Sequence, residues 1–379
     1  MTSIEGLILT PGGWLRGSLT HDGGRIVALQ GEPAGDEAWR DSAEAIALPG
    51  FIDLHVHGGG GADTMQAAKG GQAIDTIART HARHGTTALL ATTMTAPRGE
   101  IEAALRALAG ACRSRSEGAA RVLGVHLEGP YISPDKLGAQ PAFSLAPSAT
   151  EILALSALAP IRVVTLAPEL AGALETTDAL VAAGMRVQIG HSAASYEDAC
   201  AALQRGASGF THLFNAMNGL HHRAPGAVGA ALAHAQHAEL IPDLLHVHLG
   251  AMRAALRAIP GLYCVTDATA AAAMPDGEYH LGRHVVHKCG GGVRLADGTL
   301  AGSTLTMDQA LRNLVEGVGL GLREASLRVS THAAQYLGLT DRGALRVGAL
   351  ADVVVLDAQL RVRRVVVEGQ EDIDVADAP

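Results

Sequence analysis

Five short motifs between residues 55 and 267 carry histidine or carboxylate side chains that could bind a metal or move a proton. Each motif lies in or directly after a short apolar run, which is typical of a buried strand. In a barrel of parallel strands, residues at the downstream strand ends face one rim and build one site. The motifs therefore predict a site assembled from several strands. They are His55-Val56-His57, His126-Leu127-Glu128-Gly129-Pro130, Gly190-His191-Ser192, Thr211-His212-Leu213-Phe214-Asn215 and Val265-Thr266-Asp267.

The first motif places two histidines, His55 and His57, on one side of an extended strand. Strand side chains alternate between faces with a period of two residues, so both imidazoles can face the rim. Two ordinary strand histidines are the alternative for this motif by itself. The four other motifs favour metal binding.

Glu128, His191 and His212 end three different expected strands. A carboxylate and two imidazoles that leave one coordination position open are typical of a hydrolytic metal site, because water can occupy that position. The metal lowers the pKa of the water and polarises a substrate carbonyl. Each residue alone could be an ordinary buried or solvated side chain. Their coincidence at three strand ends favours a shared metal.

Asp267 follows the last apolar run of the barrel segment. A carboxylate that faces an activated water can take its proton and return it to the leaving nitrogen. The alternative is an aspartate that caps a helix N-terminus, which stays ionised and only accepts hydrogen bonds. Position alone leaves both roles open.

Composition excludes several functional classes. The net charge of −9 argues against a nucleic-acid surface. The chain has no run of about 18 apolar residues, so no transmembrane helix is expected, and its N-terminal residues do not resemble a signal peptide. The four cysteines stand apart without a CxxC pair, as reduced thiols do. We expect a cytoplasmic enzyme with neither nucleic acid nor membrane as a partner.

Residues 49–342 alternate between apolar strands and amphipathic helices, which predicts an α/β fold, a parallel (β/α)8 TIM-type barrel. Short strands near both ends of the chain predict a small β-sandwich domain made of residues 1–48 and 343–379. A β-hairpin insertion is expected at residues 280–295. The eight barrel strands are expected at residues 51–57, 86–90, 122–127, 163–166, 186–189, 209–212, 244–247 and 263–266.

Together, the motifs resemble the N-acetylglucosamine-6-phosphate deacetylases of the amidohydrolase superfamily. The resemblance runs from about Pro49 to Leu314 and is specific because it combines several motifs: Pro-Gly-Phe-Ile-Asp before His-x-His, His-Leu-Glu-Gly-Pro, Gly-His-Ser, Thr-His-Leu-Phe-Asn-Ala-Met, Val-Thr-Asp-Ala and Leu-Ala-Gly-Ser-Thr-Leu-Thr-Met. It implies a metal-dependent hydrolase that converts N-acetyl-D-glucosamine 6-phosphate into D-glucosamine 6-phosphate and acetate.

The resemblance assigns roles to individual residues. Glu128, His191 and His212 match the principal metal ligands, and Asp267 matches the catalytic acid–base. His55 and His57 place the chain with the family members that keep both histidines, so one or two ions per chain are expected. The metal expected is zinc, with iron, manganese or cobalt as alternatives. The positions that match substrate-binding residues are Ala139, Gln140, Asn215, Ala216, Arg223, Asp243, His246, Leu300, Ala301, Gly302 and Ser303.

Arg223 offers the planar donor fork that binds a phosphate. In the family the matching arginine reaches a neighbouring subunit, so a homodimer is expected. Gln140, Ala224 and Leu244 depart from the common family pattern, which leaves the galactosamine or mannosamine isomer open as the substrate. An inactive amidohydrolase-like binding protein is the other alternative, and the retained metal ligands with Asp267 argue against it.

Overall fold

The computed structural model describes residues 1–40, 43–69 and 72–375. Among these residues, six parallel strands form one sheet and two further parallel strands form a pair. Backbone hydrogen bonds close the ring, from Leu213 N–H to Glu239 O at 2.9 Å and from Asp267 N–H to His55 O at 3.0 Å. This ring confirms the predicted barrel. Its strands are, in order, β5 (Phe51–Val56), β8 (Thr86–Thr92), β9 (Arg121–Glu128), β10 (Ile161–Leu166), β11 (Arg186–Ile189), β12 (Gly209–Phe210), β13 (Glu239–Leu240) and β14 (Tyr263–Cys264).

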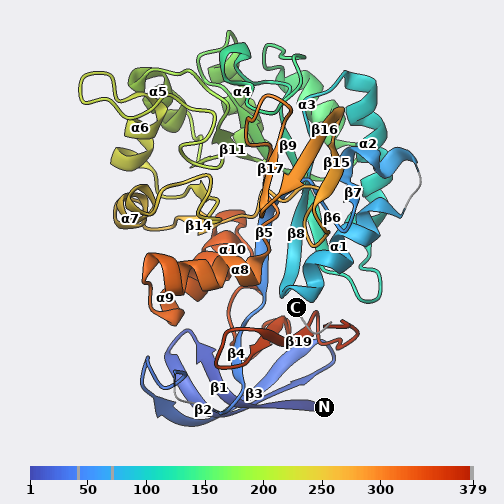
Figure 1. The fold of residues 1–379 in the computed structure, drawn as a ribbon, viewed down its shortest axis with the longest axis vertical. Coiled ribbons are helices and arrows are strands. Elements are labelled where there is room, and N and C mark those ends of the chain that lie inside the picture. The colour runs from blue at the N-terminus through green and yellow to red at the C-terminus, as the bar shows by residue number, and fades with distance from the viewer. Residues whose placement is uncertain (41–42, 70–71, 376–379) are drawn as a thin grey trace.

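Helices cover the outside of the ring (Figure 1). Each barrel strand is covered on both of its faces, so nearly all of its residues are buried. In β8, for example, every residue is buried. No helix within the described ranges is long and apolar enough to cross a membrane. The α-helices are α1 (Ala73–Arg83), α2 (Arg98–Arg113), α3 (Ala149–Ser156), α4 (Ala173–Ala182), α5 (Tyr196–Gln204), α6 (Gly226–His234), α7 (Leu249–Ala258), α8 (Met307–Arg312), α9 (Leu322–Ser326) and α10 (His332–Leu337). Two short 3-10 helices, η1 (Thr64–Lys69) and η2 (Pro134–Lys136), and two π-helices, η3 (Asn313–Val318) and η4 (Leu327–Thr331), complete the helical elements of the described residues.

The seventh strand of the ring lies earlier in the chain than predicted. The sequence predicts it at residues 244–247, but the strand is β13, and the predicted segment forms a turn. The Asp243 carboxylate accepts hydrogen bonds from two backbone N–H groups that follow it, at 2.9 and 2.8 Å, and Leu244 has a left-handed φ of 66°. A side chain that satisfies nearby backbone donors competes with strand pairing. The prediction was wrong because the leucines of this segment lie exposed on the surface.

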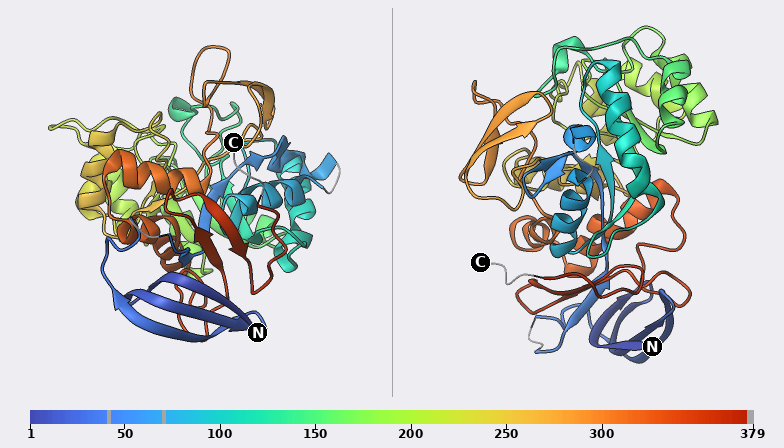
Figure 2. Two further views of the ribbon diagram at one scale, coloured as in Figure 1. Left: turned by 60° about the horizontal axis from the view of Figure 1, so that its bottom comes forward. Right: turned by 90° about the vertical axis from the view of Figure 1, so that its right-hand side faces the viewer.

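Strands from both ends of the chain share one six-stranded sheet at one end of the barrel (Figures 1 and 2). Only Gly50 separates β5 from the preceding strand of this sheet, which ends at Pro49. The Gly50 N–H donates to Asp352 O at 2.9 Å. The predicted small β-sandwich domain thus corresponds to one six-stranded sheet to which both ends of the chain contribute. Its boundaries at residues 48 and 343 remain a prediction. The strand order of the sheet is β19 (Val362–Val366), β18 (Val353–Leu356), β4 (Ile46–Pro49), β1 (Thr2–Thr10), β2 (Gly13–Asp22) and β3 (Arg25–Ala34).

An antiparallel insertion follows β14, where the sequence predicts a hairpin. It has a small apolar core of its own, in which Leu281 packs with Met94 from the loop after β8. Its tip is held to the barrel because Gly282 N–H donates to Asp63 Oδ2 at 2.9 Å. The insertion consists of β15 (Gly277–Leu281), β16 (His284–Cys289) and β17 (Gly292–Arg294), and a short pair, β6 (Gly58–Gly59) and β7 (Ala62–Asp63), follows β5.

Glu368 joins the terminal sheet to the barrel. Its carboxylate accepts two hydrogen bonds from the Arg121 guanidinium, at 2.8 and 2.6 Å, and also pairs with Arg342. Burial alone would raise the pKa of Glu368, but the two arginines outweigh burial and lower it to about 2. A carboxylate whose pKa is lowered by folding stabilises the folded state at pH values above its unfolded-state pKa. This stabilisation is lost as the pH falls through the pKa of the carboxylate in the folded state.

We therefore expect Glu368→Gln to lower the melting temperature at pH 7. The difference from the wild type should shrink as the pH falls from 4.5 toward 2, since the wild-type carboxylate is then protonated as well. Thermal unfolding followed across this pH range measures the effect, with the exposed Glu5→Gln as the control. A difference that stays constant down to pH 2 would contradict the prediction.

Candidate metal centre and active site

The carboxylate of Glu128 and the rings of His191 and His212 meet at the rim of the barrel. Glu128 is the last residue of β9, and the histidines lie just beyond the ends of β11 and β12. The two Nε2 atoms lie 3.1 Å apart, and each lies 3.1 Å from Glu128 Oε1. All three residues are buried. The structure thus brings the three predicted metal ligands together as one group of donor atoms.

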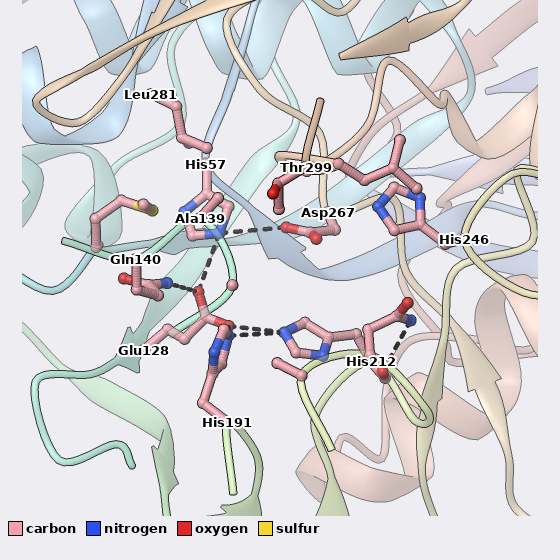
Figure 3. A pocket seen from close by; sticks show the side chains of 16 residues that line it. His57, Glu128, Ala139, Gln140, His191, His212, His246, Asp267, Leu281 and Thr299 are labelled. Atoms are coloured by element: carbon pink, nitrogen blue, oxygen red, sulfur yellow. Dashed lines mark hydrogen bonds and ion pairs between the residues drawn. The ribbon is translucent and has the colours of Figure 1, made fainter. Parts of the chain in front are cut away.

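A second group of donor atoms lies on the other side of the Glu128 carboxylate (Figure 3). The Nε2 atoms of His55 and His57 are 3.2 Å apart. His57 Nε2 also lies 3.2 Å from Asp267 Oδ1 and 3.2 Å from Glu128 Oε2. Glu128 therefore turns one oxygen toward each group.

Hydrogen bonds fix which nitrogen carries the proton in two of these rings. His191 Nδ1 lies 2.8 Å from the Lys136 carbonyl oxygen, and His55 Nδ1 lies 2.9 Å from the Glu239 carboxylate, so Nδ1 is the donor in both. In the neutral rings, each Nε2 then points a lone pair at the other donor atoms. Lone pairs and carboxylate oxygens that converge in this way repel unless positive charge lies among them. The residues therefore fit a divalent cation, with imidazoles oriented from behind as metal ligands are.

The electrostatics of the two groups also favour bound positive charge. Burial alone would lower the pKa of His57, but the carboxylates of Asp267 and Glu128 outweigh burial and raise it to about 9. Burial alone would raise the pKa of Asp267, but His55 and His57 lower it to about 2. Protons thus compete with a cation for the same donor atoms, so we expect metal affinity to fall at low pH.

Three of the site residues have a backbone conformation that side chains other than glycine rarely adopt. The φ angles are 47° at His191, 29° at His212 and 51° at Asp267. Such conformations cost about 1–3 kcal/mol each and persist where the surrounding structure imposes them, often at functional sites. Their coincidence at the rim supports a functional role for these residues.

A cavity of about 190 Å³ lies over the donor atoms. Gln140 is fixed at its edge, because Thr95 N–H donates to Gln140 Oε1 at 2.8 Å and Gln140 Nε2 donates to Glu128 Oε2 at 2.7 Å. The residues at predicted substrate-binding positions that line this cavity are Ala139, Gln140, Asn215, Ala216, His246, Leu300 and Gly302.

Three other predicted substrate-binding residues lie behind the cavity wall. Asp243 accepts a hydrogen bond from His246 Nδ1 at 2.6 Å and so orients that ring. Ala301 packs in the core of the insertion. The Ser303 hydroxyl donates to Thr266 O at 2.5 Å. These positions suit residues that support the wall.

Arg223 does not reach the cavity within this chain. It is exposed on the loop that precedes α6, which projects from the side of the molecule (Figures 1 and 2). Its Nη1 lies 2.8 Å from His222 Nε2. The side chain is therefore separated from the cavity and open to solvent in the described part of the chain.

Residues 46–374 match the model of the amidohydrolase family. The chain belongs to this family. This amidohydrolase is 42% identical over 372 residues to the N-acetylgalactosamine-6-phosphate deacetylase of Escherichia coli O157:H7, covering 96% of this chain and 97% of the relative. It is 42% identical over 332 residues to the N-acetylglucosamine-6-phosphate deacetylase of Lysinibacillus sphaericus, covering 85% and 84% of the two chains.

A solved mutant of the N-acetyl-D-glucosamine-6-phosphate deacetylase of Mycobacterium smegmatis, in complex with N-acetyl-D-glucosamine-6-phosphate, has the same fold as this amidohydrolase. The TM-score is 0.89, the identity is 32%, and the match covers 99% of this chain and 100% of the other. These comparisons confirm the resemblance predicted from the motifs.

Sequence reasoning missed two buried carboxylates that position the donor groups of this amidohydrolase. Glu239 accepts hydrogen bonds from His55 Nδ1 at 2.9 Å and from the backbone N–H of His212 at 3.1 Å, so it holds a residue of each group. Asp53 accepts the Thr266 hydroxyl at 2.6 Å and thereby ties β5 to the segment before Asp267. The available signal was a single acidic residue within each apolar strand.

Proposed function

We propose that this amidohydrolase hydrolyses the acetamide of N-acetyl-D-glucosamine 6-phosphate to D-glucosamine 6-phosphate and acetate. The observation that carries the proposal is the cavity in which the donor atoms of Glu128, His191 and His212 face Asp267. The relatives named as deacetylases of N-acetylated amino-sugar phosphates support the choice of substrate. Release of acetate from this substrate, measured with purified protein, tests the proposal. A protein that binds the sugar phosphate without turnover would favour the inactive binding protein instead.

The residues of the cavity account for the proton transfers of the reaction. A divalent metal, when bound by Glu128, His191 and His212, polarises the carbonyl and lowers the pKa of a water molecule. The Asp267 carboxylate lines the cavity and can accept the proton of the attacking water. Water adds to the carbonyl carbon, the C–N bond breaks, and Asp267 delivers the proton to the leaving nitrogen. Zinc is the metal we expect, with iron, manganese or cobalt as alternatives.

The sugar phosphate is assigned to the side of the cavity with Asn215 and His246. The Asn215 amide offers donors and an acceptor for hydroxyl groups. Burial alone would lower the pKa of His246, but Asp243 outweighs burial and raises it, which favours a charged ring beside a phosphate. Arg223 completes this site in our proposal from a second copy of the chain, since it does not reach the cavity of its own chain. We therefore propose a homodimer.

Replacing Arg223 by alanine should raise the Michaelis constant. Charge-assisted hydrogen bonds contribute roughly 1.5–3 kcal/mol, which is about 10- to 150-fold in affinity. The turnover number should change little, because phosphate is bound equally in the ground and transition states. Steady-state kinetics with phosphorylated and unphosphorylated N-acetylglucosamine measure the effect, and the variant should lose part of the preference for phosphate. A variant that discriminates as well as the wild type would remove Arg223 from phosphate recognition.

The second donor group is proposed to hold a second ion. Replacing His55 and His57 together by alanine should reduce the metal content per chain and leave the ion at Glu128, His191 and His212 in place. Elemental analysis of protein purified without chelator measures the content. If the double variant and the wild type contain equal amounts of metal, one ion is bound and this proposal is wrong.

N-acetyl-D-galactosamine 6-phosphate is the second candidate substrate. It is favoured by the 42% identity to the deacetylase of that sugar phosphate, over 96% of this chain. The two sugars differ in the configuration of one hydroxyl, so the metal centre and Asp267 would act in the same way on both. The values of kcat/KM for both isomers, and for the mannosamine isomer, measured side by side decide between them.

A further inference from the structure

Two buried apolar side chains, Met94 and Leu281, line one side of the cavity. Each is 2% exposed, and they pack in one apolar cluster with the core of the insertion. In a site for a charged sugar phosphate, such a wall must face an apolar part of the ligand.

This apolar wall lies opposite the side assigned to the sugar phosphate. Met94 follows β8, the second strand of the ring, whereas Asn215 follows β12, the sixth. Loops after the second and sixth of eight strands face each other across the barrel. Figure 3 shows Leu281 on the side of His57 and Gln140, and His246 on the far side beyond Asp267.

We propose that Met94 and Leu281 form the pocket for the acyl group and restrict the substrate to short N-acyl chains. The proposal rests on the proposed function. The amide carbon must lie between the Glu128 group and Asp267 if it is to react. Its nitrogen carries the sugar toward Asn215, so the acyl chain points to the opposite wall.

The wall is braced and cannot retreat easily from a longer chain. Leu281 ends β15 at the tip of the insertion, and the next residue, Gly282, donates its N–H to Asp63. Arg283 pairs with Glu100, with Nε 3.1 Å from Oε2, and its guanidinium lies 5.2 Å from the ring centre of Phe143. Contacts with β7, with the first turn of α2 and with the loop after β9 thus hold the tip in place.

Met94 also separates the active-site cavity from a larger space. A second cavity of about 700 Å³ lies on its other side, lined also by Met65, Thr95 and Arg283. Met94 is the one side chain that lines both cavities among the residues of the described ranges. Shortening it should therefore connect the two spaces and admit a longer acyl chain.

The test uses N-acetyl-, N-propionyl- and N-butyryl-glucosamine 6-phosphate with the full-length enzyme. A pocket discriminates one methylene by about 10- to 200-fold, so the wild type should prefer acetyl over propionyl within that range. Met94→Ala and Leu281→Ala should each raise the ratio of butyryl to acetyl kcat/KM at least about tenfold. Leu281→Phe should narrow the pocket. It should therefore lower kcat/KM for the N-acetyl substrate relative to kcat/KM for an N-formyl substrate.

Val286→Ala is the matched control, because Val286 is fully buried in the same apolar cluster and does not line the cavity. It should weaken the insertion without changing the acyl ratios. Ratios that stay at wild-type values in Met94→Ala and Leu281→Ala, or that change equally in Val286→Ala, would overturn the acyl pocket. A wild type that releases acetate but shows no preference for it would do the same. A wild type without activity on any of these amides would instead refute the proposed function.

Discussion

Chelation of the bound metal should abolish turnover of N-acetyl-D-glucosamine 6-phosphate, and added zinc should restore it. Three donor atoms of Glu128, His191 and His212 converge within 3.1 Å of one another, an arrangement that fits a divalent cation. Without a cation, bulk water with a pKa near 15.7 is a poor nucleophile at neutral pH. Activation by the metal contributes several kcal/mol, so we expect the chelated protein to keep less than about one thousandth of the wild-type activity.

The measurement is acetate release before chelation, after chelation and dialysis, and after readdition of each candidate metal. Circular dichroism of the metal-free protein controls for unfolding, because a ligand that binds only the folded state also stabilises it. Full turnover by protein shown to contain no metal would be incompatible with the proposed mechanism.

Asp267→Asn should retain the ion at Glu128, His191 and His212 and lose activity by a factor of about 10²–10⁴, the usual contribution of general acid–base catalysis. The amide cannot accept the proton of water. Asparagine is also the suitable replacement for the backbone, since Asp267 has a φ of 51° and asparagine tolerates left-handed conformations better than alanine does. The substitution therefore changes the chemistry with little added strain.

Kinetics, metal analysis and thermal unfolding should be measured on the same Asp267→Asn preparation. Retention of the ion at Glu128, His191 and His212 and unchanged stability, together with a large loss in kcat, identify a proton-transfer role. A variant within a few-fold of the wild type would exclude Asp267 as the base.

The sequence predicts the barrel well where each element has its own periodic signal. The helix α2, for example, has apolar residues that recur at helical spacing, as the expected alternation of strands and amphipathic helices requires. The prediction fails at residues 244–247, where two leucines imitate a buried strand but a carboxylate side chain stabilises a turn. Local hydrophobicity does not show whether a side chain finds a core, and this depends on the neighbouring strands.

The site is predictable to the extent that its residues mark strand ends. Glu128, His191 and His212 converge because the barrel directs the ends of parallel strands to one rim. Glu239 contacts His55 and Asp53 contacts Thr266, and no spacing rule connects either pair because its members lie far apart in the sequence. Arg223 illustrates a different limit of prediction from sequence. No spacing of residues shows that its loop projects away from the cavity of its own chain.

The connection from the terminal sheet into the barrel constrains when the active site can form during synthesis. β4 begins at residue 46, and β18, its neighbour on one side, begins at residue 353. At about 5–20 residues per second, roughly 15–60 s separate the emergence of the two strands from the ribosome. During that time one edge of β4 has no partner, and an open edge invites pairing with other chains. Because only Gly50 separates β4 from the strand that carries His55, the metal centre should become complete as one of the last events of folding.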